Sequence, residues 1–335
     1  MTEQAVEYKR YTLSETVDIL CERRDTLILC HARPDCDAIG SAIALKRVLE
    51  SAGMRAYCLC ENEKPKRLEF IECGQESILP ESLPESFEGA RVISVDTASP
   101  SQLGALAELY LDRVELMIDH HGKGTQYADG YIIPGAAATG ELIFDISREM
   151  LRRGAIDKID LDTDTAIYAA ISSDTGCFRY SSVTSKTHNI AASLVSAGVD
   201  AAEVNHKLYD CKPFIQLKAE KLGFENMSFY RAGKIGIIEF PYSLKMKHGI
   251  EDEYMETLVD VARSVEGVEI AAVIRQPLDT RFFRCSMRSN SDFDVSAICA
   301  RFGGGGHVKA AGCTIEADTV GDAKRLLLEA LGEKI

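Results

Sequence analysis

The stretch Thr26-Leu27-Ile28-Leu29-Cys30-His31-Ala32-Arg33-Pro34-Asp35-Cys36-Asp37 decides how this chain of 335 residues folds. A short run of β-type apolar residues leads directly into a histidine and two aspartates. Open parallel sheets bind their ligands at the edge formed by the carboxyl ends of the strands. The stretch therefore predicts a buried strand that delivers polar ligands to such an edge.

Three further stretches carry the same kind of side chain. Two of them follow apolar runs at residues 91–95 and 114–118, and they read Asp96-Thr97 and Asp119-His120-His121; the third is Ser173-Asp174-Thr175-Gly176. Together the four stretches supply more carboxylates and imidazoles than one structural zinc would bind. Mixed oxygen and nitrogen donors with shared carboxylates predict two divalent ions, as in sites that hydrolyse phosphoesters.

The order of the expected elements predicts two domains. Apolar strand-like runs alternate with helix-like segments over residues 1–210, which indicates an α/β domain with a doubly wound, mainly parallel sheet. Residues 211–230 are predicted to form a helical linker, and residues 231–335 a smaller α+β domain. The glycine-rich residues 122–135 are expected to form a loop beside the site.

These residues resemble a known family. His31-x-x-x-Asp35-x-Asp37, Val95-Asp96-Thr97, Asp119-His120-His121 and Ser173-Asp174-Thr175-Gly176-x-Phe178 resemble, in order, four motifs of the DHH phosphoesterase superfamily. Phe302-Gly303-Gly304-Gly305-Gly306-His307 resembles the motif of the DHH-associated C-terminal domain. Each motif alone is weak, but five in order are specific. In length and domain content the chain is similar to the short-oligonucleotide ribonucleases that also dephosphorylate 3′-phosphoadenosine 5′-phosphate.

The resemblance implies a ligand set for two ions. His31, Asp35 and Asp96 would hold one ion, and Asp37, Asp96, His120 and Asp174 the other, so that Asp96 bridges them. Mn²⁺ is the expected metal, with Mg²⁺ and Fe²⁺ as alternatives. Asp37 immediately precedes a predicted helix, so a simple N-cap is the alternative interpretation of that residue.

The adjacent histidines are expected to divide their roles. Neighbouring side chains of an extended segment point in opposite directions, so one ligand and one non-ligand are expected. His120 is assigned to the metal and His121 to the phosphate or the leaving group. Asp119 is expected to orient an imidazole, which makes His121 and Asp119 the predicted catalytic pair. The alternative is that His121 is an ordinary surface histidine.

The C-terminal motif predicts where the substrate is held. Arg288 is expected to grip a terminal phosphate, since its planar guanidinium suits that geometry, with Asn290 close by. Gly304, Gly305 and Gly306 would let backbone N–H groups approach a phosphate or a base, next to His307. The alternative for the glycine run is a flexible turn.

Two positions depart from the family pattern. Cys36 stands between the two aspartates where a smaller residue is expected, which predicts sensitivity to oxidation. Gln102 stands where relatives often carry arginine. These departures leave the metal chemistry intact and affect the expected substrate preference.

Composition limits the class of partner and the compartment. The net charge of −14 argues against a protein that tracks long nucleic acids. Eleven cysteines without a Cys-x-x-Cys pair indicate reduced thiols. Residues 1–10 lack the apolar core of a leader, and no apolar run is long enough for a membrane span. We therefore expect a cytoplasmic protein without a membrane partner; monomer and homodimer both stay open.

The expected activity is metal-dependent hydrolysis of short oligoribonucleotides and dinucleotides to mononucleotides, and of 3′-phosphoadenosine 5′-phosphate to AMP. The main alternative is a phosphodiesterase for cyclic or linear signalling dinucleotides. A manganese pyrophosphatase is disfavoured by the glycine run, and a long-strand exonuclease by the acidic charge. A nucleotide-sensing module without activity is disfavoured by the complete ligand set.

Overall fold

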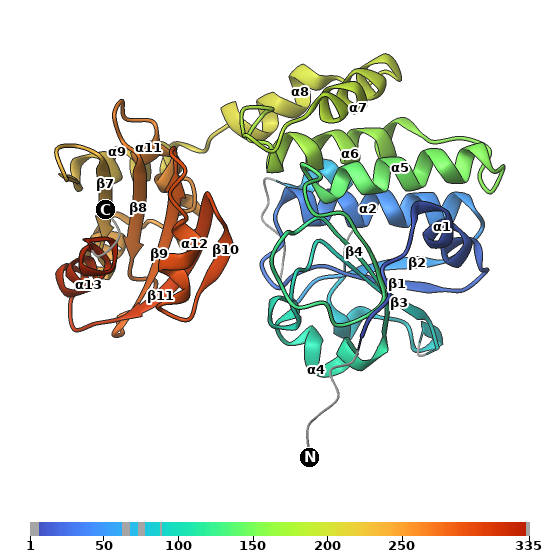
Figure 1. Ribbon diagram of the computed structural model, residues 1–335, viewed down its shortest axis with the longest axis horizontal. Helices are drawn as coiled ribbons and strands as arrows, with labels where there is room; N and C mark the ends of the chain where they lie inside the picture. The colour runs from blue at the N-terminus through green and yellow to red at the C-terminus, as the bar shows by residue number, and fades with distance from the viewer. Residues whose placement is uncertain (1–6, 62–67, 73–77, 88, 333–335) are drawn as a thin grey trace. The chain divides into compact units, whose positions relative to one another are not determined.

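The computed structural model describes residues 7–61, 68–72, 78–87 and 89–332 of the chain. It divides into two compact units, Met1–Cys211 and Lys212–Ile335 (Figure 1). The first six residues, which belong to the stretch considered above for a leader, lie outside the described residues. Within the described ranges, no helix has the length and apolar character that crossing a bilayer would need.

The first unit contains a parallel sheet of five strands, which confirms the predicted doubly wound α/β fold. In spatial order these are β2 (Ala56–Leu59), β1 (Thr26–Leu29), β3 (Arg91–Val95), β4 (Val114–Asp119) and β5 (Gly130–Ile132). Strand β5 lies within the glycine-rich stretch that was expected to be a loop, so that expectation was wrong there. A Cβ at Gly130 would lie 2.8 Å from the carbonyl oxygen of Met117 on β4, which explains the glycine in this strand.

Helices cover both faces of this sheet (Figure 1). On one face, an apolar core joins the strands to α1 (Leu13–Cys21), α2 (Cys36–Ser51), α5 (Thr139–Arg152) and α6 (Leu161–Asp174). On the other, a smaller core holds the 3-10 turn Pro100–Leu103 and α4 (Leu106–Tyr110). The other helices of this unit are α3 (Glu69–Glu72), α7 (Ser185–Ser196) and α8 (Ala201–Asn205). A π-helical turn spans His206–Asp210, and further 3-10 turns span Pro80–Ser82, Glu85–Phe87 and Leu111–Arg113.

Helix α6 packs closely against α2 and α5, and each of these two helices carries a glycine at the contact. A Cβ at Gly40 of α2 would lie 2.7 Å from the carbonyl oxygen of Ala166. A Cβ at Gly140 of α5 would lie 2.8 Å from the side chain of Ala170. The close packing brings the C-terminal end of α6 to the starts of α2 and α5, where the candidate site lies.

The second unit contains a mixed sheet with helices on both faces, which confirms the smaller α+β domain. The strand order is β10 (Gly305–His307), β11 (Ala310–Glu316), β9 (Phe282–Ser289), β8 (Ile270–Arg275), β7 (Ile235–Phe240) and β6 (Met227–Tyr230). The helices are α9 (Phe214–Glu225) and α11 (Leu258–Arg263) on one face, α12 (Val295–Ala300) and α13 (Val320–Gly332) on the other, and the peripheral α10 (Tyr242–His248). The stretch expected as a linker, residues 211–230, contains α9 and β6, and both pack within this unit.

Candidate metal centre

The predicted ligands of the first unit meet at the carboxyl edge of the parallel sheet. His31 follows β1, Asp96 follows β3 directly, and Asp119 ends β4 with His120 and His121 after it. The starts and ends of helices complete the set: Asp35 and Asp37 stand at the start of α2 and Asp174 at the end of α6. Residues from five elements are thereby brought to one place.

Asp96 belongs to three groups of possible metal ligands: one with His31 and Asp35, one with Asp37 and His120, and one with Asp119 and His121. In the first, His31 Nε2 lies 3.8 Å from Asp35 Oδ1 and 3.9 Å from Asp96 Oδ2. In the second, His120 Nε2 lies 3.6 Å from Asp96 Oδ1 and 3.9 Å from Asp37 Oδ2. Asp174, which is outside these groups, has its Oδ2 3.5 Å from the same nitrogen. The two oxygens of Asp96 thus face different histidines, which is the geometry that a bridging carboxylate requires.

These separations suit cations better than hydrogen bonds. At 3.5–3.9 Å, the contacts from the two histidine Nε2 atoms are as long as or longer than a normal hydrogen bond. Two ligands that each sit about 2.1 Å from one ion are themselves about 3–4 Å apart. Oxygen and nitrogen donors at this spacing, without sulfur, fit Mn²⁺, Mg²⁺ or Fe²⁺.

The buried carboxylates repel one another unless a cation lies among them. Asp37 and Asp96 are almost fully buried. Burial, together with the neighbouring charges of Asp96 and Asp174, raises the pKa of Asp37 well above its usual range. Burial and the charge of Asp35 raise the pKa of Asp96 as well. Divalent cations would relieve both the desolvation and the repulsion, so the residues present fit the implied metal pair.

Asp37 is held by the start of another helix. Its carboxylate accepts the backbone N–H groups of Thr139 at 2.7 Å and Gly140 at 2.9 Å, and the hydroxyl of Ser41 at 3.1 Å. The N-cap of α5 is an alanine that makes no side-chain cap, so Asp37 satisfies the first N–H groups of α5 from outside. The N-cap of α2 itself is Asp35, which accepts the N–H of Ala38, so the alternative interpretation of Asp37 as a local cap was wrong.

Asp96 occupies an uncommon backbone position. Its φ of 54° lies in the left-handed region, which residues other than glycine, asparagine and aspartate seldom adopt. Its N–H donates to the carbonyl of Ile118 on the neighbouring strand at 3.0 Å, and its Oδ1 accepts the hydroxyl of Thr139 at 2.8 Å. These contacts hold the backbone and the carboxylate of Asp96 in place.

A backbone carbonyl group fixes the ring orientation of His120. Its Nδ1 lies 2.9 Å from the carbonyl oxygen of Ala136, and a carbonyl can only accept, so Nδ1 carries the proton. In the neutral imidazole, the lone pair is then on Nε2, which faces the carboxylates of Asp37, Asp96 and Asp174. This is the arrangement of a metal-binding histidine whose second nitrogen is held by a backbone acceptor.

His121 pairs with Asp119 as the sequence led us to expect. Its Nδ1 lies 2.7 Å from Asp119 Oδ1, whereas the shortest contact to Asp96 is 3.8 Å. Burial lowers the pKa of His121, but Asp119 and Asp96 outweigh that effect and bring it to about 9. The pair is close to the metal-type ligands, and its catalytic role stays a prediction.

The two departures from the family pattern have structural partners. Gln102 accepts the N–H groups of Ala98 and Ser99, so it holds the loop that follows Asp96. The thiol of Cys36 is buried and lies 3.3 Å from the carbonyl oxygen of Ala169 on α6. Its predicted sensitivity to oxidation stays a prediction.

In the second unit, Arg288 and His307 lie on the same side of the sheet. Ala310 of β11 pairs directly with Arg288 of β9 and with His307 of β10. Directly paired residues of antiparallel strands project to the same face. The backbones of Arg288 and His307 are two strand spacings, or about 10 Å, apart. The surface between them carries only small side chains, since the nearest residues of β11 on that face are Ala310 and Gly312.

The glycine run includes β10, the edge strand of this sheet, which lies close against β11. A Cβ at Gly304 would lie 2.2 Å from the carbonyl oxygen of Gly312, and one at Gly306 would lie 2.5 Å from that of Ala310. Gly306 also has a φ of 138°. Gly304 and Gly306 are therefore required by the close approach of β11, whereas Gly305 has open space and is exposed. The interpretation as a merely flexible turn does not fit this paired strand.

Asn290 has partners inside its own unit. Its side-chain amide donates to the carbonyl oxygens of Arg263 and Val268, both at 2.9 Å. These bonds tie the end of β9 to the segment after α11. The predicted role of Asn290 in substrate binding stays a prediction, and its amide N–H groups already have acceptors.

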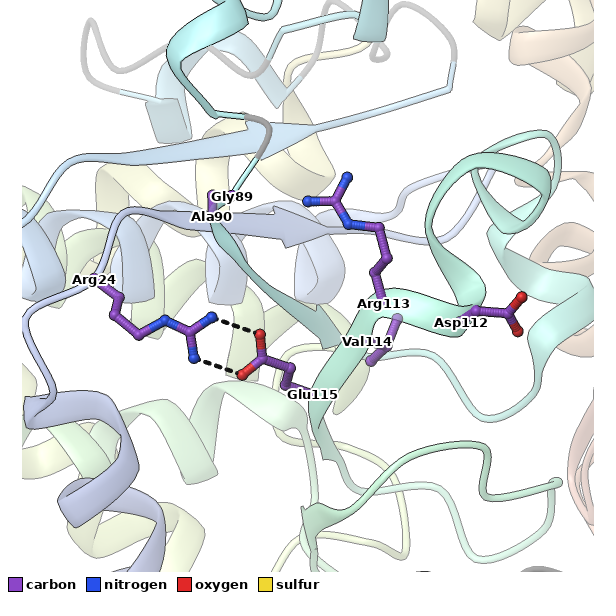
Figure 2. Close-up of a pocket in the computed structure, with 7 residues that line it drawn as sticks. All are labelled: Arg24, Gly89, Ala90, Asp112, Arg113, Val114 and Glu115. Carbon is purple, nitrogen blue, oxygen red and sulfur yellow. Dashed lines mark hydrogen bonds and ion pairs between the residues drawn. The ribbon is translucent and has the colours of Figure 1, made fainter.

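A surface pocket of the first unit lies at the other ends of the strands (Figure 2). Arg24 and Glu115 form a two-point ion pair on its wall, with N–O distances of 2.7 and 2.8 Å. The pocket also touches Ala90 and Val114, which stand at the starts of β3 and β4. The metal-type ligands follow the opposite ends of these strands, so this pocket is separate from the candidate site.

Comparison with family models agrees with the motifs. Residues 25–171 match the model described as "DHH family, N-terminal domain", and residues 239–333 match the DHHA1 domain. The first match contains every predicted ligand of the first unit except Asp174. The second contains Arg288, Asn290 and the glycine run.

Two curated relatives illustrate the kinds of protein to which the chain is similar. The chain is 29% identical over 316 residues to the "bifunctional oligoribonuclease and PAP phosphatase NrnA" of Thermus thermophilus, covering 92% of this chain and 89% of the relative. It is 27% identical over 336 residues to the "cyclic-di-AMP phosphodiesterase PdeA" of Listeria monocytogenes, covering 94% of this chain but 48% of that protein.

A solved structure supports the fold. An exopolyphosphatase-related protein from Bacteroides fragilis has a TM-score of 0.86 at 23% sequence identity, over 96% of this chain and 95% of the other. At this identity the likeness concerns the fold alone.

Proposed function

We propose that this chain, which belongs to the DHH family and carries a DHHA1 domain, is a divalent-metal-dependent phosphoesterase that hydrolyses very short oligoribonucleotides to mononucleotides. We further propose that it converts 3′-phosphoadenosine 5′-phosphate to AMP. The observation that carries the proposal is that Asp96 is shared by a ligand group with His31 and Asp35 and by another with Asp37 and His120. The relative from Thermus thermophilus supports the substrate class, because the match runs over most of both chains.

Each residue of the centre has a proposed task. His31, Asp35 and Asp96 would hold one ion, and Asp37, Asp96, His120 and Asp174 the second. Mn²⁺ is the proposed metal. Divalent ions at such a site polarise the phosphoester and make bound water acidic enough to react near neutral pH. His121, oriented by Asp119, would bind the phosphate oxygen or the leaving group.

The second unit is proposed to hold the substrate through Arg288 and His307. They stand on one side of the sheet, and Ala310 is paired with both of them. The surface therefore offers two hydrogen-bond donors with only a small side chain between them. The exposed backbone of Gly305 lies in the same strand as His307. An anionic nucleotide of limited size fits such a patch better than a long polymer does.

The first experiment compares substrates of different length. With Mn²⁺, we expect the protein to hydrolyse a dinucleotide at least about tenfold faster per end than a 24-nucleotide RNA, because an acidic surface repels a long polyanion. Initial rates measured at several salt concentrations give the comparison. Excess EDTA should stop both reactions. Equal rates per end with equal salt dependence would contradict the short-substrate proposal, and full activity in EDTA would contradict the metal proposal.

A second candidate function is hydrolysis of cyclic dinucleotides. The match to PdeA favours it, although this chain covers about half of that protein. The same assay discriminates the two functions, because a dedicated cyclic-dinucleotide enzyme would act faster on the cyclic than on the linear compound.

The role of the second unit is tested by Arg288→Ala and His307→Ala. Loss of a charge-assisted contact to phosphate costs about 1.5–3 kcal/mol, so kcat/KM for a dinucleotide should fall by about ten- to a hundredfold. Hydrolysis of bis-p-nitrophenyl phosphate, which lacks the second nucleotide, should scarcely change, and bound metal should stay as in the wild type.

The matched control is Arg281→Ala, since Arg281 is an exposed arginine just before β9 that pairs with Asp318 at 3.0 Å. It should leave both activities unchanged. Equal losses on the two substrates in Arg288→Ala would mean that this residue supports folding rather than substrate binding.

A further inference from the structure

We propose that Thr139 is a positioning residue of the metal centre, one that holds the carboxylates of Asp37 and Asp96 in the orientation in which they bind divalent ions. The inference rests on the proposed function, because these two aspartates are among its proposed ligands. Thr139 itself is not a proposed ligand; it would act through the two carboxylates.

One residue makes both contacts. The backbone N–H of Thr139 donates to Asp37 Oδ2 at 2.7 Å, and its hydroxyl donates to Asp96 Oδ1 at 2.8 Å. Thr139 is completely buried, at 0% exposure. Asp37 comes from the start of α2 and Asp96 from the end of β3, so Thr139 fixes two ligands from separate elements relative to each other.

The contacts leave the carboxylates able to bind ions. An ionised carboxylate has about four lone-pair directions, so an oxygen that accepts one hydrogen bond keeps another direction for a cation. Asp96 Oδ1 lies 3.6 Å from His120 Nε2, and Asp37 Oδ2 lies 3.9 Å from the same atom. The two oxygens that Thr139 contacts are thus the ones that share an ion position with His120.

Fixing the rotation of a ligand is worth a measurable amount of affinity. Losing an outer partner of a metal ligand typically costs ten- to a hundredfold in metal affinity or activity. The carboxylate of Asp96 is buried, as is that of Asp37, so an oxygen that loses its hydrogen-bond donor there is left unsatisfied. The hydroxyl of Thr139 is the donor that satisfies Oδ1.

The test separates the hydroxyl from the packing of the side chain. Thr139→Ser and Thr139→Ala both remove the methyl group, and only serine keeps the hydroxyl; Thr139→Val keeps the shape and removes the hydroxyl. Calorimetric titration of Mn²⁺ into metal-free protein should give a dissociation constant about ten- to a hundredfold higher for alanine and valine, and within about threefold of wild type for serine. The Mn²⁺ concentration for half-maximal turnover of a dinucleotide should shift by the same factor.

The matched control is Thr163→Val. Thr163 is a buried threonine in the first turn of α6 whose hydroxyl donates to Asp160 at 2.6 Å, away from the centre. It should lower the melting temperature without changing Mn²⁺ affinity.

The outcomes discriminate the two proposals. If the wild type binds Mn²⁺ and hydrolyses dinucleotide while Thr139→Ala binds Mn²⁺ as tightly as Thr139→Ser, the positioning role is wrong and the proposed function stands. Weak binding by the serine variant as well would assign the effect to packing and also overturn the role. A wild type that neither binds Mn²⁺ nor hydrolyses dinucleotide overturns both proposals.

Discussion

Asp96→Asn should lose both metal ions and slow hydrolysis of a dinucleotide by at least about a thousandfold. Both proposed ion positions include Asp96, so removing its charge weakens both at once. Metal ions stabilise the charge that develops in such reactions by several kcal/mol, and each 1.4 kcal/mol is tenfold in rate. Metal content after desalting, together with initial rates, measures the effect.

Asparagine is chosen as the replacement because it tolerates the backbone conformation of residue 96. Asp96 has a φ of 54°, a conformation that asparagine adopts readily and alanine does not. The side chain also keeps an oxygen that can accept the hydroxyl of Thr139. Loss of metal by Asp96→Asn would therefore report the missing charge rather than a strained loop.

Asp162→Asn serves as the control for this prediction. Asp162 is a half-exposed aspartate of α6 that pairs with Arg47 at 2.8 Å, far along the helix from Asp174. It should keep both metals and full turnover. Retention of two ions and wild-type turnover by Asp96→Asn would contradict the proposal of a bridging carboxylate.

The carboxyl edge of the sheet could be predicted from the sequence because its pattern is local. Each of three apolar runs ends in a histidine or aspartate within a few residues, and parallel strands bring such ends together. Strand β5 could not be predicted in this way, since three residues in a glycine-rich stretch give no periodicity. Its glycine is explained only by the neighbouring strand, which the sequence does not identify.

The hydrogen bonds that orient the proposed ligands could not be predicted from the local sequence. The sequence of α5 does not say that its first N–H groups meet Asp37 from α2. The weak capping ability of alanine was the available signal, because unsatisfied N–H groups at a helix start require an acceptor elsewhere. Nothing in the sequence indicates that the carbonyl of Ala136 contacts the Nδ1 of His120.

The glycine run shows how a pattern can have two causes. Gly304 and Gly306 have a structural requirement in the approach of β11, whereas the sequence suggested contact with a ligand. Gly305 and His307 remain exposed on the paired strand. A structural reason for two glycines therefore does not remove the prediction that the strand as a whole contacts substrate.

The division of labour between the two adjacent histidines leads to the second large effect. His121→Ala should lower kcat for a dinucleotide by about a hundred- to ten-thousandfold, the usual contribution of a positioned acid or base, and keep both metal ions. The reason is the contrast between the rings: the Nε2 of His120 faces three carboxylates, while the Nδ1 of His121 lies 2.7 Å from Asp119. Rates at saturating Mn²⁺ and metal content of the same samples measure both properties.

A double-mutant cycle with Asp119 tests how the pair acts. If Asp119 works by orienting His121, then Asp119→Asn should reduce kcat alone but add nothing once His121 is alanine, because residues in contact are not additive. His248→Ala, at the end of α10 in the second unit, is the histidine control and should behave as wild type. Loss of metal from His121→Ala would assign that ring to an ion, and additive losses from the two substitutions would mean that Asp119 acts on the centre independently of His121.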